Sequence, residues 1–290
     1  MGRPRASPLR RILVSATTIN FGQLPALQLR APDGAEATIT LYGAHVVSWK
    51  AVTTAGGPAQ ERLFLSSLSA LDGQKAIRGG VPVIFPQFAE RGTGMRHGFA
   101  RVATWRVLDQ GEADGAAFAV LALNQGDLPQ QLAAAWPYAF ELLLRVAVRG
   151  AQLDMSLDVR NTGTQTFPFA AALHTYHLVE DVEAVRIDGV QAETLAITDK
   201  LDHVFERIQG AIAFDTGADK VTLEQTGFND AVVWNPGAAD AAALSDMEDE
   251  EYRRFVCIEP ALLGDAAAPP QQLEPGGIWR GTYRAVVQAG

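Results

Sequence analysis

Three short segments of the sequence gather side chains that can bind or transform a small polar molecule. In the first, residues 75–101, Arg78, Arg96 and Arg101 stand within or beside glycine-rich turns. Glycine lets the backbone approach a ligand closely, and a guanidinium fork binds an anion through two parallel hydrogen bonds. The segment therefore predicts an anion site, with pairing of each arginine to a surface carboxylate as the open alternative.

The second segment contains two histidines three residues apart, His174 and His177. Such a pair can bind a metal, but the neighbouring residues 167–173 are typical of a β-strand, where residues three apart point to opposite faces. Zinc would also need further Cys, His or carboxylate ligands nearby. We therefore expect one histidine to face a cavity, the other to be structural, and no metal site.

The third segment, residues 255–260, ends an apolar run with Glu259. A carboxylate at the end of an apolar strand loses part of its hydration, which raises its pKa and suits it to act as a base. A strand-end glutamate that points into water is the alternative. Cys257 has apolar neighbours, so we expect a buried and inert thiol rather than a nucleophile.

Short alternating segments must position these side chains. Apolar and polar residues alternate within runs separated by Gly, Pro, Asn or Asp, which is typical of an antiparallel β-sandwich. The clearest runs are residues 37–42, 45–49, 140–148, 153–159, 185–188 and 282–287.

The best helix candidate is residues 238–254, whose acidic run 246–251 we interpret as a solvated helix face. Residues 15–290 contain no linker or fixed repeat, so we expect one large all-β sandwich domain with few short helices. Residues 1–14 are expected to form a disordered basic tail.

Composition excludes several function classes. The net charge of −9 argues against a general nucleic-acid binder, which needs excess Lys and Arg to neutralise phosphates. A single cysteine excludes an internal disulfide, and no apolar run approaches the roughly 20 residues of a membrane span. We expect a cytoplasmic, monomeric protein whose partner is a small molecule, not a nucleic acid or a membrane.

Five motifs in order resemble those of the glucose-6-phosphate 1-epimerases, the hexose-6-phosphate mutarotases of the galactose-mutarotase-like superfamily. They read YGAHVVSW at 42–49, AIRGGVP at 76–82, HGFAR at 97–101, ALHTY at 172–176 and VCIEPA at 256–261. The resemblance covers roughly residues 15–288. It implies a large β-sandwich that binds a sugar in a groove across one sheet.

The resemblance also implies roles for individual residues. His174 and Glu259 match the catalytic pair, and Arg78 and Arg101 match arginines that bind substrate. Asp219 is similar to the sugar-binding aspartate, although its local motif is degenerate.

Two positions depart from the family pattern. Arg96 stands where the family often has Gln; we include it, with the adjacent His97, among the candidate substrate-binding residues. His177 stands where the family usually has Phe, which favours a non-catalytic role.

The implied reaction is the interconversion of α and β anomers of a hexose 6-phosphate. A base takes the proton of the anomeric hydroxyl while an acid protonates the ring oxygen, and the two roles reverse on closure. We expect Glu259 as the base and His174, as imidazolium, as the acid, on opposite sides of the sugar and without a cofactor. The alternatives are an aldose 1-epimerase acting on free sugars and a non-catalytic carbohydrate-binding protein.

Overall fold

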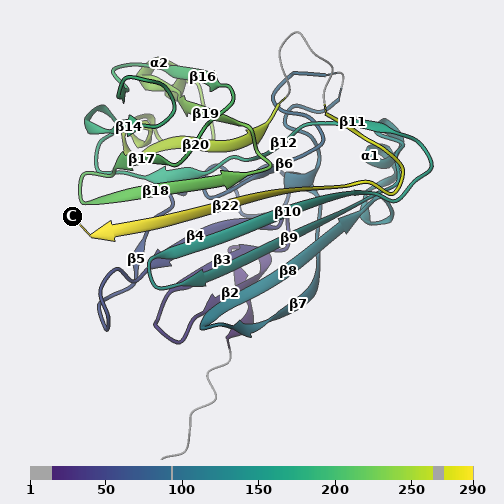
Figure 1. Ribbon diagram of the computed structural model, residues 1–290, viewed down its shortest axis with the longest axis horizontal. Helices are drawn as coiled ribbons and strands as arrows, with labels where there is room; N and C mark the ends of the chain where they lie inside the picture. Colours follow the sequence, from purple (N-terminus) through teal and green to yellow (C-terminus); the bar gives the residue numbers. More distant parts are fainter. Residues whose placement is uncertain (1–14, 93, 264–270, 290) are drawn as a thin grey trace, which may run out of the picture.

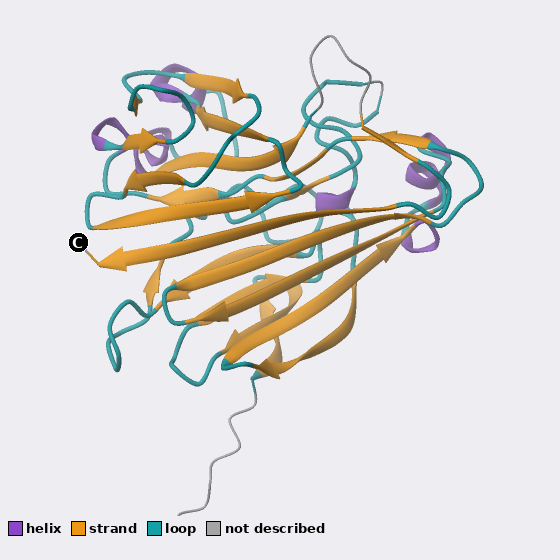
Figure 2. Ribbon diagram, in the orientation of Figure 1, coloured by secondary structure: helices purple, strands orange, loops and turns teal. Residues whose placement is uncertain are grey.

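The computed structural model describes residues 15–92, 94–263 and 271–289 of the chain. Strands dominate and helices are confined to short segments (Figure 2), so the expected all-β architecture is confirmed. Every strand ladder in the described part of the chain is antiparallel. The tail expected at residues 1–14 lies outside the described residues.

A nine-stranded sheet crosses the molecule in the order β15-β14-β17-β18-β22-β10-β9-β8-β7 (Figure 1). Its strands are β7 (Arg106–Ala113), β8 (Ala116–Asn124), β9 (Phe140–Arg149), β10 (Gln152–Asn161), β14 (Arg186–Asp188), β15 (Leu195–Ala196), β17 (Ile212–Asp215), β18 (Asp219–Thr226) and β22 (Ile278–Ala289). The alternation expected in β10 is confirmed, because Leu153, Met155, Leu157 and Val159 are all buried on one face. Each such side chain stabilises the fold by about 1.5–3 kcal/mol.

A five-stranded sheet in the order β1-β2-β3-β4-β5 packs against that apolar face. Its strands are β1 (Ala16–Phe21), β2 (Leu24–Arg30), β3 (Glu36–Thr40), β4 (His45–Ala51) and β5 (Gln60–Glu61). Ile39 and Trp49 from this sheet join Leu144 and Leu157 of the larger sheet in one core cluster. The two sheets therefore form the sandwich that the alternation predicts.

A six-stranded sheet carries the residues of functional interest. It contains β6 (Val83–Ile84), β12 (Ala171–Leu173), β13 (Tyr176–Leu178), β16 (Leu201–Phe205), β19 (Asp230–Asn235) and β20 (Phe255–Leu262). The order is β16-β19-β20-β12-β6, with β13 also paired to β20. All eight residues of β20 are buried. A two-stranded ladder, β11 (Phe167–Phe169) with β21 (Gln271–Leu273), completes the described sheets.

The helices of the described residues are short. They are α1 (Gln130–Ala135), α2 (Gly237–Ala241) and the 3₁₀ turns η1 (Ala100–Val102), η2 (Gln125–Asp127), η3 (Val182–Ala184) and η4 (Asp249–Arg254). No helix in these ranges is long and apolar enough to cross a membrane.

The single helix expected at residues 238–254 is wrong. The segment is two pieces, α2 and η4, because a reciprocal capping box between Glu248 and Glu251 starts a new helical turn. The acidic run is also not simply a solvated face. Asp246 accepts a hydrogen bond from the guanidinium of Arg78, and Glu251 accepts one from the hydroxyl of Ser66. These contacts tie the segment to the rim of the sheet that carries the site.

Candidate active site

Strand registers bring the chemical candidates onto one face of the six-stranded sheet. In the ladder between β19 and β20, Val232 stands opposite Glu259 and Trp234 opposite Cys257. β16 extends the row of Trp234 and Cys257, since Asp202 pairs with Trp234. Residues two apart in a strand share a face. Asp202, Trp234 and Cys257 therefore form one row of side chains, and Val232 and Glu259 form the next.

His174 completes the second row from the other side of β20. The flanking ladder pairs are Ala172↔Ala261 from β12 and Tyr176↔Cys257 from β13. Both pairs belong to a single register, which places His174 directly opposite Glu259. Opposed side chains in an antiparallel pair have Cβ atoms about 4.5–5.5 Å apart. The two candidates, 85 residues apart in sequence, are therefore cross-strand neighbours.

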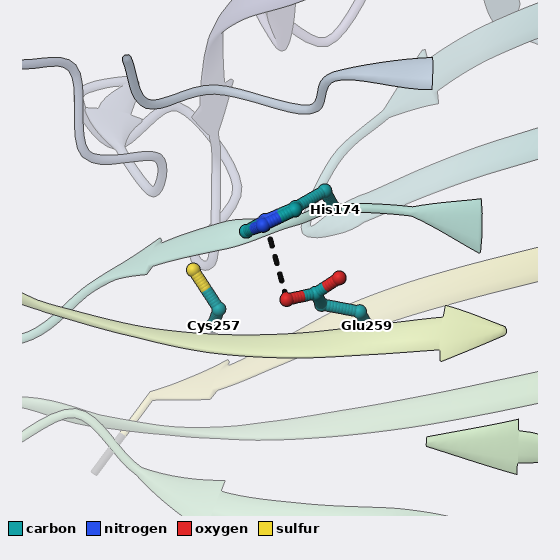
Figure 3. A group of neighbouring side chains, drawn as sticks. All are labelled: His174, Cys257 and Glu259. Atoms are coloured by element: carbon teal, nitrogen blue, oxygen red, sulfur yellow. Dashed lines mark ion pairs between the residues drawn. The ribbon is translucent and has the colours of Figure 1, made fainter. Parts of the chain in front are cut away.

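The two groups lie side by side, with Nδ1 of His174 3.3 Å from Oε1 of Glu259 (Figure 3). The expectation that they flank the sugar from opposite sides is wrong, because this gap holds no sugar ring. Side-by-side placement still suits the chemistry, since the hydroxyl O1 and the ring oxygen O5 are bonded to the same carbon.

Three polar atoms of the pair lack partners. Nδ1 of His174 and both carboxylate oxygens of Glu259 are buried and accept or donate no hydrogen bond among the described residues. Leaving a buried polar group unpaired costs about 1–3 kcal/mol. Structures keep such groups where a ligand or water satisfies them. The pair therefore has hydrogen-bonding capacity that a ligand or water can use.

Burial shifts the pKa values of the pair in opposite directions. Burial, aided by the charge of Asp202, raises the pKa of Glu259 well above its ordinary value. Burial, followed by the nearby charges of His97, Arg101 and Arg78, lowers the pKa of His174 well below its ordinary value. Both shifts favour the uncharged forms, a carboxyl group on Glu259 and a neutral imidazole on His174. The imidazolium expected at His174 stays a prediction for the complex with substrate.

Arg78 lines the site and is paired with a carboxylate, that of Asp246. Its guanidinium donates to both oxygens of Asp246 at 3.2 and 3.3 Å and to the hydroxyl of Tyr176 at 3.0 Å. It also lies 6.0 Å from the ring centre of Trp234. The turn beneath it needs Gly79, whose φ is +111° and whose Cβ, if present, would lie 2.5 Å from the carbonyl of Phe64.

Arg101 differs, because its charge has no carboxylate partner among the described residues. Its Nη2 donates to the backbone carbonyl of Arg96, and its buried Nε has no partner. Burial and the charges of Arg78 and Arg96 lower its pKa. A partly buried charge without a counter-charge is costly, so Arg101 is the strongest candidate to bind an anion.

Arg96 and His97 lie on the loop that leads to Arg101. Arg96 is largely exposed and stands 3.5 Å from Glu90, whereas His97 is buried with its ring edge-on to His174 at 5.5 Å. Burial and the surrounding arginines lower the pKa of His97 to about 3. A proton on His97 would repel a proton on His174, which is one reason why the pKa of His174 is low.

These residues line one cavity of about 420 Å³, a size suited to a small polar ligand. Of the predicted site residues, the structure brings together Arg78, Arg96, His97, Arg101, His174 and Glu259. A larger cavity of about 750 Å³, lined mainly by apolar residues such as Trp136 and Phe169, contains neither member of the acid–base pair. The smaller cavity is the candidate active site.

Asp219 is not brought to this cavity, so its expected role is corrected. It begins β18 in the nine-stranded sheet and forms an ion pair with Arg62. The aspartates that line the cavity are Asp202, on β16, and Asp246. The sequence carries little signal for Asp202, because β16 is short and its neighbours follow no distinctive pattern.

Tyr176 and Asp246 are further site residues that sequence reasoning did not assign. The Tyr176 ring stacks on the imidazole of His174, with centroids 4.9 Å apart and planes inclined by 11°. Its place in the ALHTY motif was an available signal. The sequence did not distinguish Asp246 from the other residues of the acidic run, because its contact with Arg78 forms only in the folded chain.

The structure also places His177, Cys257 and Glu259, the other residues that the second and third segments of the sequence singled out. His177 faces away from the cavity and contacts Tyr283 and Phe214, as its strand position predicts. Cys257 is buried, and burial raises the pKa of its thiol, as expected for an inert cysteine. Glu259 lies inside β20 rather than at a strand end, so its burial is deeper than the sequence indicates.

Comparison with known proteins identifies the family. The family model described as aldose 1-epimerase matches residues 25–205, more than half of the chain. A Cenchrus ciliaris protein provisionally named glucose-6-phosphate 1-epimerase is 36% identical over 287 residues, covering 89% of this chain and 83% of that protein. An Escherichia coli protein with the same provisional name is 33% identical, covering 79% of this chain and 81% of its own length.

Solved structures agree on the fold. The crystal structure of a provisionally named mutarotase from Salmonella typhimurium superposes with a TM-score of 0.82 at 24% identity, covering 97% of this chain and 96% of that one. Galactose 1-epimerase from Lactobacillus acidophilus superposes with a TM-score of 0.65 at 13% identity, covering 96% and 99%. The match of the family model and the identity to these relatives show that this chain belongs to the aldose 1-epimerase family, isomerases that interconvert sugar anomers.

Proposed function

We propose that this enzyme interconverts the α and β anomers of a hexose 6-phosphate, with His174 and Glu259 as the proton-transfer pair. The observation that carries the proposal is one cavity that holds both this pair and the half-buried guanidinium of Arg101, which has no carboxylate partner among the described residues. The names of the two curated relatives point to the same substrate class. Arg78, Arg96 and Lys75 add positive charge to the cavity walls.

The bound phosphate also prepares the acid–base pair. Arg78 and Arg101 lower the pKa of His174 in the absence of a ligand. A phosphate dianion beside them offsets their charge, which raises the pKa of His174 toward its ordinary value. The proton on Glu259 can then pass across the 3.3 Å gap to Nδ1 of His174. Substrate binding thus generates the carboxylate and the imidazolium that the reaction needs.

Ring opening follows from this charge state. The Glu259 carboxylate takes the O1 proton, the C1–O5 bond breaks as a C1=O1 double bond forms, and His174 delivers a proton to O5. Nδ1 faces Glu259, so Nε2 is the ring nitrogen that serves O5. Rotation about C1–C2 and the reverse transfers give the other anomer. Asp202, which lines the same cavity, is proposed to accept hydrogen bonds from sugar hydroxyls.

Exchange NMR of an α-hexose 6-phosphate tests the catalytic pair. His174→Ala and Glu259→Gln should each lower the enzyme-catalysed rate by about 10²–10⁴-fold, the usual contribution of general acid–base catalysis. Asp219→Asn, outside the cavity, is the control and should retain activity if the variant folds. Near-normal turnover in either member of the pair would refute its assignment.

The phosphate contact is tested separately. Arg101→Ala should raise KM for the phosphorylated sugar about 10–100-fold, because a hydrogen bond to a charged group contributes about 1.5–3 kcal/mol. Turnover of the free hexose should change little. The matched control is Arg280→Ala, since Arg280 pairs with Asp158 on the nine-stranded sheet. Equal loss on both sugars would instead favour an enzyme for free sugars, in which Arg101 contacts hydroxyls.

A further inference from the structure

Cys257 lies on the face of the sheet that carries the site, and the proposed reaction does not use it. It stands in the row of side chains next to Glu259, directly opposite Tyr176. Its side chain leaves the strand on the same side as that of Glu259, the side on which His174 lies (Figure 3). One ligand atom from each of these three residues lies within 4.8 Å of the other two. The three side chains thus converge on one point beneath the cavity.

The three donors suit a thiophilic divalent cation. Imidazole nitrogen, thiolate sulfur and carboxylate oxygen are the donors that zinc takes in proteins, and three protein ligands with one open position are the usual set of an accessible zinc site. Zinc bonds of about 2.0–2.3 Å place tetrahedral ligand atoms about 3.3–3.6 Å apart. The distance from Nδ1 of His174 to Oε1 of Glu259 is already 3.3 Å.

A second observation points to a ligand at the same place. Nδ1 of His174 and both oxygens of Glu259 are buried without hydrogen-bond partners in the described part of the chain, and the two side chains are 10% and 1% exposed. These are lone pairs that a cation can use without breaking an existing contact. The cavity above them supplies the route of entry and the open coordination position.

We propose that His174, Cys257 and Glu259 form a binding site for Zn²⁺ or a similar soft divalent ion, and that the bound ion inhibits the enzyme. On binding, the Cys257 thiol and the Glu259 carboxyl group release their protons to water. The ion then occupies the lone pairs that ring opening requires. Inhibition rests on the proposed catalytic roles of His174 and Glu259, whereas binding of the ion does not.

The charge around the site limits the affinity. Arg78 and Arg101 oppose a cation, while Asp202 and Asp246 on the cavity wall partly offset them. The ion is therefore a reversible inhibitor rather than a structural component. EDTA should remove it and restore mutarotation.

Cobalt(II) absorption tests binding without reference to activity. A thiolate bound to Co²⁺ gives a near-ultraviolet charge-transfer band, and the chain has a single cysteine, so this band in the unmodified enzyme can arise only from Cys257. We expect the band on adding Co²⁺ and its loss on adding excess Zn²⁺. Absence of the band would overturn the proposal.

Zn²⁺ titration of mutarotation tests the consequence. The unmodified enzyme should fall to the spontaneous rate, and Cys257→Ala should keep its activity and need about 10–100-fold more Zn²⁺, at least the loss caused by removing an outer partner of a metal ligand. Cys257→Ser provides a second variant of similar volume. His203→Ala, which removes an exposed histidine of β16, is the control and should stay as sensitive as the unmodified enzyme.

The outcomes separate the two proposals. Equal zinc sensitivity in Cys257→Ala and the unmodified enzyme would overturn the site, because the inhibiting ion would then lie elsewhere. A cobalt–thiolate band with full activity would support the metal site and refute the roles assigned to His174 and Glu259.

Discussion

Tyr176 connects the two ends of the candidate site. Its ring stacks on His174 and its hydroxyl accepts a hydrogen bond from Arg78. The ring therefore holds the imidazole over the sheet, while the hydroxyl holds the guanidinium. One side chain thus positions a group for proton transfer and a group for anion binding.

Substitutions at Tyr176 should separate these contacts. Tyr176→Phe keeps the stacked ring and loses the hydrogen bond to Arg78, so KM for hexose 6-phosphate should rise about tenfold while kcat changes little. Tyr176→Leu also removes the stacked ring and should lower kcat. Steady-state kinetics on both variants give the measurement. A fall in kcat for Tyr176→Phe as large as that for Tyr176→Leu would contradict the division of roles.

At the scale of elements, the turn before Val81 decides where Arg78 lies. Gly79 takes a φ of +111° and packs against the backbone of Phe64 and Leu65, leaving no space for a Cβ. The strand-like alternation of neighbouring segments does not reveal this constraint. The turn connects the sandwich to the site, since Val81 pairs with Val46 of β4.

Two glycine substitutions separate the effect of the contact between Gly79 and Phe64 from that of backbone strain. Gly115→Ala places a Cβ in open space at a φ of +76° and should lower the free energy of unfolding by about 1–2 kcal/mol from backbone strain alone. Gly79→Ala has the same sign of φ but also collides with Phe64, so its loss should be larger and should include activity. Urea denaturation and mutarotation rates measure both. Equal effects of the two variants would exclude a role for the close contact.

The site also depends on which strands pair. His174 and Glu259 each stand in a recognisable motif, and their candidacy was predictable from the sequence. Their contact arises because β12 and β13 share one register on β20. A shift of one residue would turn either side chain to the opposite face of the sheet.

At the scale of the molecule, buried histidines make stability depend on pH. The pKa is lowered to about 4 for His45 and to about 3 for His97 and His177, first by burial in each case, and it is also lowered for His174. In the unfolded chain each titrates near 6.5. Between these values the unfolded state binds more protons, so the free energy of unfolding falls as pH falls from about 6.5 toward 4.

Each histidine contributes up to about 2 kcal/mol of this loss at pH 5. His177→Phe should therefore reduce the loss measured by urea denaturation at about pH 7 and pH 5, and should retain mutarotase activity because His177 faces away from the cavity. Glu259 acts in the opposite direction. Its raised pKa contributes stability at low pH that is lost as pH rises above about 4.5. An unchanged acid sensitivity in His177→Phe would show that His177 is not one of the titrating groups.

Family membership favours catalysis over the alternative of a carbohydrate-binding module. The monomeric state, the cytoplasmic location and the division of the chain at residue 15 stay predictions. They rest on composition and on the absence of a linker-like segment.

The sequence by itself determined the all-β class, several of the strands and six of the residues that meet in the cavity. Alternation and motif residues are local properties, so they can be read along the chain. Only the tertiary structure decided that Asp202 rather than Asp219 faces the cavity and that Arg78 is paired while Arg101 is not. It also decided that burial shifts the pKa values of Glu259 and His174 in opposite directions. Those properties depend on strand register and on burial, which bring distant segments together and remove the water that would otherwise set the pKa values.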